Sequence, residues 1–143
     1  MKRLLAAGLL VMLGLSLMGM GKMEMNGKTE EIPVPDREVT AVVVDLEGVT
    51  LNLSQFSING QTALSGKLGA GKAAVLFSQI KTVTLVPEAK VLRARVDLAD
   101  NQIVNLILDR GLTAYGRTRF GTYQVQLDQL KKIEILAVTE KKK

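Results

Sequence analysis

The stretch that decides the fold is GRTRFGTYQVQLDQLKKIEIL, which runs from Gly116 to Leu136 and has an earlier copy, GKLGAGKAAVLFSQIKTVTLV, at Gly66 to Val86. The identical pairs in the two segments are Gly66/Gly116, Gly71/Gly121, Val75/Val125, Gln79/Gln129 and Lys81/Lys131. Roughly one identity is expected from ordinary composition over such a length, and further aligned positions keep an apolar residue. The chain is therefore a duplication.

The residues around both copies predict short β-strands. Val39 to Leu46 is rich in β-branched residues, and Val49 to Leu53 alternates apolar with polar side chains. The alternation changes phase near Ser54–Gln55, which predicts a β-bulge, and Asn59–Gly60 predicts the turn of a β-hairpin. A single helical turn is expected before the last strand of each copy. No helical periodicity follows the amino-terminal segment, so the predicted fold class is all-β.

This plan of five strands with one helical turn between the fourth and fifth resembles SH3-like and Sm-like small barrels. The resemblance implies two tandem five-stranded units, residues 38–87 and 88–136, packed into one β-sandwich or standing as a pair of small barrels. The run from Gly116 to Ile133 also resembles segments of uncharacterised exported bacterial β-domains, which implies a location more than an activity.

One predicted strand is apolar on both faces. Ala73 to Phe77 contains only apolar residues, whereas the matching strand of the second copy alternates with polar ones. We therefore expect this strand to be covered on both sides, either by the second unit or by another chain, and the latter would make the protein a homo-oligomer.

The amino terminus predicts export. Lys2 and Arg3 precede an uncharged segment that continues to Gly21, so residues 1–21 are expected to form a signal helix that is cleaved before Lys22 or retained as an inner-membrane anchor. The protein is then periplasmic or secreted, and it contacts a membrane only if the segment is uncleaved. Residues 22–37 are expected to be a linker, and residues 137–143 a basic tail.

Composition excludes several kinds of chemistry. The 143 residues include no Cys and no His, which removes lipid anchoring through a cysteine, disulfides, the commonest general base and the usual zinc ligands. Loss of Lys2 and Arg3 with the signal leaves 17 basic and 14 acidic residues, a surplus too small to indicate nucleic acid. We expect no enzyme activity, no metal and no cofactor, and we interpret the turn acids, such as Asp45 and Asp100, as solvated.

Two short motifs look catalytic, but the repeat explains both. Gly66 to Lys72 has the spacing of a phosphate-binding loop, yet Ala73 follows where Ser or Thr is required, and a strand follows in place of a helix. Ser78 to Lys81 matches S-x-x-K, but its copy begins with Asp128, and Ser and Asp share a role as helix caps rather than as nucleophiles. The four repeated glycines are predicted to be structural turn residues: Gly66, Gly71, Gly116 and Gly121.

The candidate binding surface lies in the second copy. Tyr115, Arg117 and Arg119 share one strand parity, and Arg110 lies in the preceding turn. Aromatic and guanidinium groups are typical of interface hot spots and of anion contacts, whereas the competing interpretation is a solvated strand with cross-strand pairs. The sequence favours a non-catalytic exported domain that binds a protein or an envelope component. The alternative is a domain that holds a small anion or a lipid between the repeats.

Overall fold

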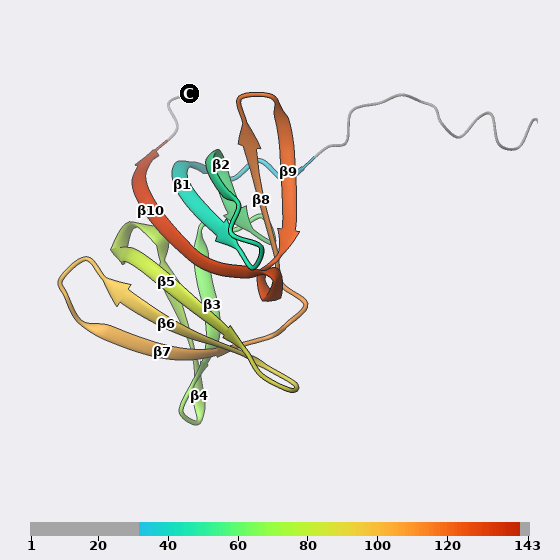
Figure 1. Cartoon of the computed structure of the whole chain (residues 1–143). Coiled ribbons are helices and arrows are strands. Elements are labelled where there is room, and N and C mark those ends of the chain that lie inside the picture. Colours follow the sequence, from blue (N-terminus) through green and yellow to red (C-terminus); the bar gives the residue numbers. More distant parts are fainter. Residues whose placement is uncertain (1–31, 141–143) are drawn as a thin grey trace, which may run out of the picture. The chain divides into compact units, whose positions relative to one another are not determined.

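The computed structural model describes residues 32–140 (Figure 1). The predicted signal segment, most of the predicted linker and residues 141–143 lie outside the described residues. Among residues 32–140, regular structure consists of ten strands and two one-turn 3-10 helices, and all strand pairs are antiparallel, which confirms the all-β class. No helix in this range is long and apolar enough to cross a membrane.

Each repeat contributes five strands and one 3-10 helix in the same chain order. The first repeat contains β1 (Arg37–Asp45), β2 (Thr50–Ile58), β3 (Ala63–Leu68), β4 (Gly71–Leu76), η1 (Phe77–Gln79) and β5 (Ile80–Pro87). The second contains β6 (Leu92–Leu98), β7 (Ile103–Leu108), β8 (Thr113–Thr118), β9 (Gly121–Gln126), η2 (Leu127–Gln129) and β10 (Leu130–Glu140). The predicted helical turn before each last strand is confirmed.

The irregular features of β2 also follow the sequence. Gln55 adopts a φ of 50°, and the register with β8 shifts between Ser54 and Ser57, so the predicted bulge is present. Asn59 and Gly60 have φ values of 52° and 82°, as a tight turn of this composition requires. The predicted hairpin is not formed, because only a single bridge, Ile58 to Gln61, links the two chain segments and β2 pairs with β8 in place of β3.

The strands exchange between the repeats. The order in the sheet is β4-β3-β7-β6-β5-β10-β1-β2-β8-β9 (Figure 1). When each strand is replaced by the equivalent strand of the other repeat, β1 by β6, β2 by β7 and so on, the same order is obtained in reverse. The second strand of each repeat pairs with the third strand of the other: β2 with β8 and β7 with β3. The expectation that residues 38–87 and 88–136 each build their own five-stranded unit is corrected accordingly, because periodicity defines strands but not their partners.

Two backbone hydrogen bonds recur at equivalent places and support the duplication. The Phe77 amide donates to the Thr62 carbonyl at 3.0 Å, and the Leu127 amide donates to the Leu112 carbonyl at 2.9 Å. In the same way, the Leu46 amide donates to the Gln129 carbonyl at 2.9 Å, and the Ala99 amide donates to the Gln79 carbonyl at 2.8 Å. Each 3-10 helix is thus held at both ends by the same contacts in both copies.

One hydrophobic core joins strands of both repeats. Its largest fully buried side chains include Phe56, Phe77, Leu106, Leu127 and Ile133. The rings of Phe56 and Phe77 lie 5.5 Å apart with an interplanar angle of 31°. Because both repeats contribute buried side chains to the same cluster, neither can bury its apolar faces alone.

The ordered domain extends beyond the predicted boundaries at both ends. Ile32 is buried, and Pro33 lies beside the Gly60 turn, so residues 32–36 pack on the domain although the sequence predicted a linker to residue 37. At the other end, β10 continues through residues 137–140, which the sequence assigned to the tail, and Val138 pairs with the fully buried Val39. The start of β1 needs a hydrogen-bonding partner, and the end of β10 supplies it.

The double-sided apolar strand is covered on one face only, where Ala73 and Val75 pack against the shared core, and its other face is open. β4 is the terminal strand at one end of the sheet, and its Leu76 remains 49% exposed. Ala74 is exposed as well. Covering of this strand by a second chain stays a prediction.

Candidate functional site

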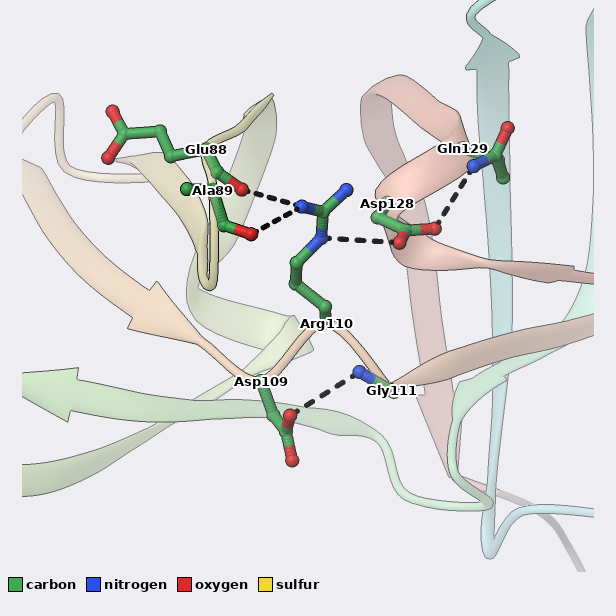
Figure 2. Close-up of polar contacts among 7 residues, drawn as sticks. All are labelled: Glu88, Ala89, Asp109, Arg110, Gly111, Asp128 and Gln129. Atoms are coloured by element: carbon green, nitrogen blue, oxygen red, sulfur yellow. Dashed lines mark hydrogen bonds and ion pairs between the residues drawn. The ribbon is translucent and has the colours of Figure 1, made fainter.

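Arg110 joins two loops and is not a free binding residue. Its Nη1 donates to the backbone carbonyls of Glu88 at 2.6 Å and Ala89 at 3.3 Å, in the turn between the repeats (Figure 2). Its Nε donates to Asp128 Oδ2 in η2 at 3.4 Å. The structure therefore gives Arg110 a structural role and does not place it with the other candidate arginines.

Asp128 completes this contact and is not a helix cap. Its side chain is 14% exposed, and its Oδ1 accepts a hydrogen bond from Gln129 Nε2 at 3.3 Å (Figure 2). The N-cap of η2 is Gln126, and that of η1 is Leu76, neither of which makes a side-chain capping bond. The prediction that Ser78 and Asp128 cap these turns is wrong, because each lies inside its 3-10 helix.

Tyr115 and Arg117 share one strand face, as the sequence predicted, whereas Arg119 lies in the turn of the same hairpin and not on that strand. Tyr115 and Arg117 project from the outer face of β8, opposite the buried Ala114 and Gly116, and Arg119 lies in the turn before β9. Arg117 Nε donates to Gln55 Oε1 at 2.9 Å, so the β2 bulge orients this guanidinium while leaving it exposed. These side chains form the arginine face of the β8–β9 hairpin.

Phe120 is the residue that the sequence-based site missed. It lies at the tip of the β8–β9 hairpin and is 78% exposed. The tip is ordered by Thr118, whose Oγ1 accepts from the Phe120 amide and donates to the Gly121 carbonyl, both at 3.1 Å. The signal that could have found it is the difference between the copies, since Ala70 occupies the matching position.

A shallow groove of about 360 Å³ lies between this tip and β2. Its walls are Thr50, Leu51 and Asn52 on one side and Thr118, Arg119 and Phe120 on the other. The start of β2, the aromatic ring of Phe120 and the guanidinium of Arg119 therefore meet at this groove. This combination suits contact with another macromolecule.

The repeated glycines have two different roles. Gly71 and Gly121 follow the hairpin tips, and Gly121 has a φ of 151°. Gly66 and Gly116 lie inside β3 and β8 rather than in turns. A Cβ added to Gly116 would lie 2.8 Å from Leu53 Cβ, and one added to Gly66 would lie 2.7 Å from Leu108 Cδ2. Both positions thus lack a side chain because the second strand of the other repeat lies against them.

The turn acids organise their own loops. Asp45 Oδ1 accepts hydrogen bonds from the amides of Glu47 and Val49, both at 2.9 Å, and Asp100 Oδ1 accepts from the Gln102 amide at 3.1 Å. Within residues 32–140 no three or more acidic, His or Cys side chains gather as a metal site would require. Burial, followed by the charge of Asp45, raises the pKa of the Tyr123 phenol.

The fold and these surfaces define an all-β domain in which two repeats exchange strands around one core. The chain matches the model of a family of uncharacterised proteins over residues 35–138, and it belongs to that family. No curated protein and no solved structure matches the chain. The matched range extends from the segment before β1 into β10, and thus includes both repeats.

Proposed function

We propose that the protein is an exported, non-catalytic binding domain that holds another protein or an envelope component with its β8–β9 hairpin. The observation that carries this proposal is the 78% exposure of Phe120 at an ordered hairpin tip, next to Arg119. Single exposed apolar residues are common on protein surfaces, but Phe120 is the most exposed of the large apolar side chains in residues 32–140, and an aromatic ring beside a guanidinium is typical of binding surfaces.

The arginines define the chemistry of the partner. Arg117 is held by Gln55, and Arg119 lines the groove beside Phe120. Neither guanidinium forms an ion pair with a residue of the described range, so both are available to carboxylates or phosphates. The hairpin is therefore suited to an acidic surface with an apolar pocket for one ring.

Location and architecture belong to the same proposal. Export rests on the charge pattern of residues 1–21, which would place the binding hairpin in the periplasm or outside the cell. The SH3-like proposal rests on five neighbouring strands of the sheet, β10-β1-β2-β8-β9. Together they contain one copy of each of the five strands of a repeat, in the order fifth, first, second, third and fourth. A 3-10 helix, η2, lies between β9 and β10. We propose that these five strands form one small SH3-like barrel and that β4-β3-β7-β6-β5 form a second.

A site-specific crosslinking experiment tests the binding face. A photo-crosslinking phenylalanine analogue replaces Phe120 in the full chain, and a matched variant carries it at Ala70, the tip of the equivalent hairpin. Illumination of cells should give a defined adduct from position 120 only, because the arginines flank that tip alone. Introducing Arg117→Glu and Arg119→Glu should reduce the adduct by roughly tenfold, since charge reversal opposes an acidic partner.

Lys131→Glu with Lys132→Glu provides the control for charge. These lysines are exposed on β10, and their reversal should leave the adduct within about twofold of the parent. The proposal would be refuted by equal adducts from positions 70 and 120, or by a yield that Arg117→Glu and Arg119→Glu leave unchanged while the melting temperature is also unchanged.

A further inference from the structure

A second groove lies where the two repeats meet, away from the β8–β9 hairpin. It has a volume of about 410 Å³ and is formed by the β3–β4 hairpin, the turn between β5 and β6, and the end of β7 with the loop that follows. The first repeat thus supplies one wall and the second repeat another. Its volume lies in the lower part of the range of small-molecule sites, about 300–1,000 Å³.

Three lysines without partners surround this groove. They are Lys67 on β3, Lys72 on β4 and Lys90 in the turn between the repeats. None of the three side chains forms a hydrogen bond or an ion pair with any residue of the range 32–140. Asp109 is the only acid in the lining, so positive charge exceeds negative charge there.

The arrangement of Lys67 and Lys72 is unfavourable without a counter-ion. The two residues are directly opposite in the β3–β4 pair, where like charges destabilise a sheet. At the same positions of the other hairpin, Arg117 faces the uncharged Thr122. An anion between the two lysines would convert this repulsion into attraction.

The groove also has apolar walls. Val91, Ile107 and Leu112 line it and are each half-buried, so they present carbon surface to the groove, and Leu112 also packs on the core. A simple inorganic anion would leave this surface in water. An organic anion would cover it, and the transfer of apolar area from water would add to the affinity.

We propose that this groove binds a small amphipathic anion, a carboxylate or phosphate ester on a single apolar chain. The head group lies among Lys67, Lys72 and Lys90, and the chain lies on Val91, Ile107 and Leu112. The volume suits one chain and not the two of a membrane phospholipid. This site does not depend on the protein-binding role of the β8–β9 hairpin.

Backbone amide shifts of the isotopically labelled full chain test this site directly, because they report where a ligand binds. Decyl phosphate and decanoate are the two probes, and decanol and inorganic phosphate are the controls that lack the charge or the chain. We expect at least one probe to shift the amides of Lys67, Lys72 and Lys90 saturably. Both controls should bind at least roughly tenfold more weakly than the better probe, since decanol lacks the charge and inorganic phosphate lacks the chain.

Matched variants assign the head group. Lys67→Gln with Lys72→Gln should weaken the bound probe by roughly tenfold, whereas Lys131→Gln with Lys132→Gln, which removes the same charge elsewhere, should change its affinity by less than about twofold. Removing the opposed charges should not unfold the β3–β4 hairpin, and amide shifts of Leu64 and Val75, a pair in the same hairpin, that stay close to those of the parent verify this.

Several results would overturn the inference. These are decanol binding as tightly as decyl phosphate, inorganic phosphate binding as tightly as either probe, or an affinity that Lys67→Gln with Lys72→Gln does not change. Amide shifts confined to other parts of the chain, or no shift with either probe, would also exclude the site. Equal shifts from vesicles of two-chain phosphatidic acid would identify a membrane surface in place of a single-chain ligand.

Discussion

The β3–β4 and β8–β9 hairpins occupy equivalent positions in the two repeats and lie at opposite ends of the sheet, yet they differ in almost every exposed residue. Both press a glycine, Gly66 or Gly116, against the second strand of the other repeat. Their tips are different: Gly69–Ala70 in one and Arg119–Phe120 in the other. The comparison teaches that strand exchange constrains the inward positions, whereas the outward positions diverged into two surfaces of different chemistry.

The largest effect is expected where the hairpins are alike. Gly66→Ala and Gly116→Ala should each lower the free energy of unfolding by about 2–3 kcal/mol, because a Cβ at either position overlaps its neighbour. Gly71→Ala is the control, since a Cβ there meets nothing within 4 Å, and it should change stability by less than about 0.5 kcal/mol. Urea unfolding of the three variants measures the difference. Equal losses in all three would show that close approach is not the reason for the repeated glycines.

A smaller difference should separate two arginines that the sequence treated alike. Arg110→Ala removes bonds to two backbone carbonyls and leaves the nearly buried Asp128 without its ion pair, so it should cost about 2 kcal/mol. Arg117→Ala removes one exposed contact and should cost less than about 0.5 kcal/mol. Thermal melting measures both. A loss for Arg117→Ala as large as that for Arg110→Ala would contradict their assigned roles.

The smallest effect concerns Tyr123, whose equivalent in the first hairpin is Ala73. Its raised pKa means that folding favours the neutral phenol, so this contribution is complete below the ordinary value of about 10 and is lost as pH rises through the higher folded value. Above that pH the parent should lose more stability than Tyr123→Phe. Absorbance titration of Tyr115→Phe, which leaves Tyr123 as the only tyrosine, should give a pKa above 10.

Asp45→Asn separates the two causes of that shift. Asparagine retains an oxygen that accepts from the Glu47 and Val49 amides but removes the charge. The pKa should fall only part of the way, because burial is the larger cause. A complete return to the ordinary value would mean that charge, and not burial, raises it.

The sequence by itself determined the local structure of this protein. Alternation of apolar residues located the strands, the phase change at Ser54–Gln55 located the bulge, and Asn59–Gly60 located the turn, because each depends on the conformational preferences of a few neighbouring residues. Repetition of five identities showed the duplication. The outer face carrying Tyr115 and Arg117 also followed from strand parity.

Only the tertiary structure decided which strands pair and which side chains are free. The pairs β2–β8 and β3–β7 join residues far apart in the chain, and alternation is equally satisfied by pairing within a repeat. The same exchange places Gly66 and Gly116 at close contacts, and the loop after β7 brings Arg110 to the carbonyls of Glu88 and Ala89. Periodicity predicts which face of a strand is buried. Which neighbouring strand it pairs with depends on the packing of the shared core.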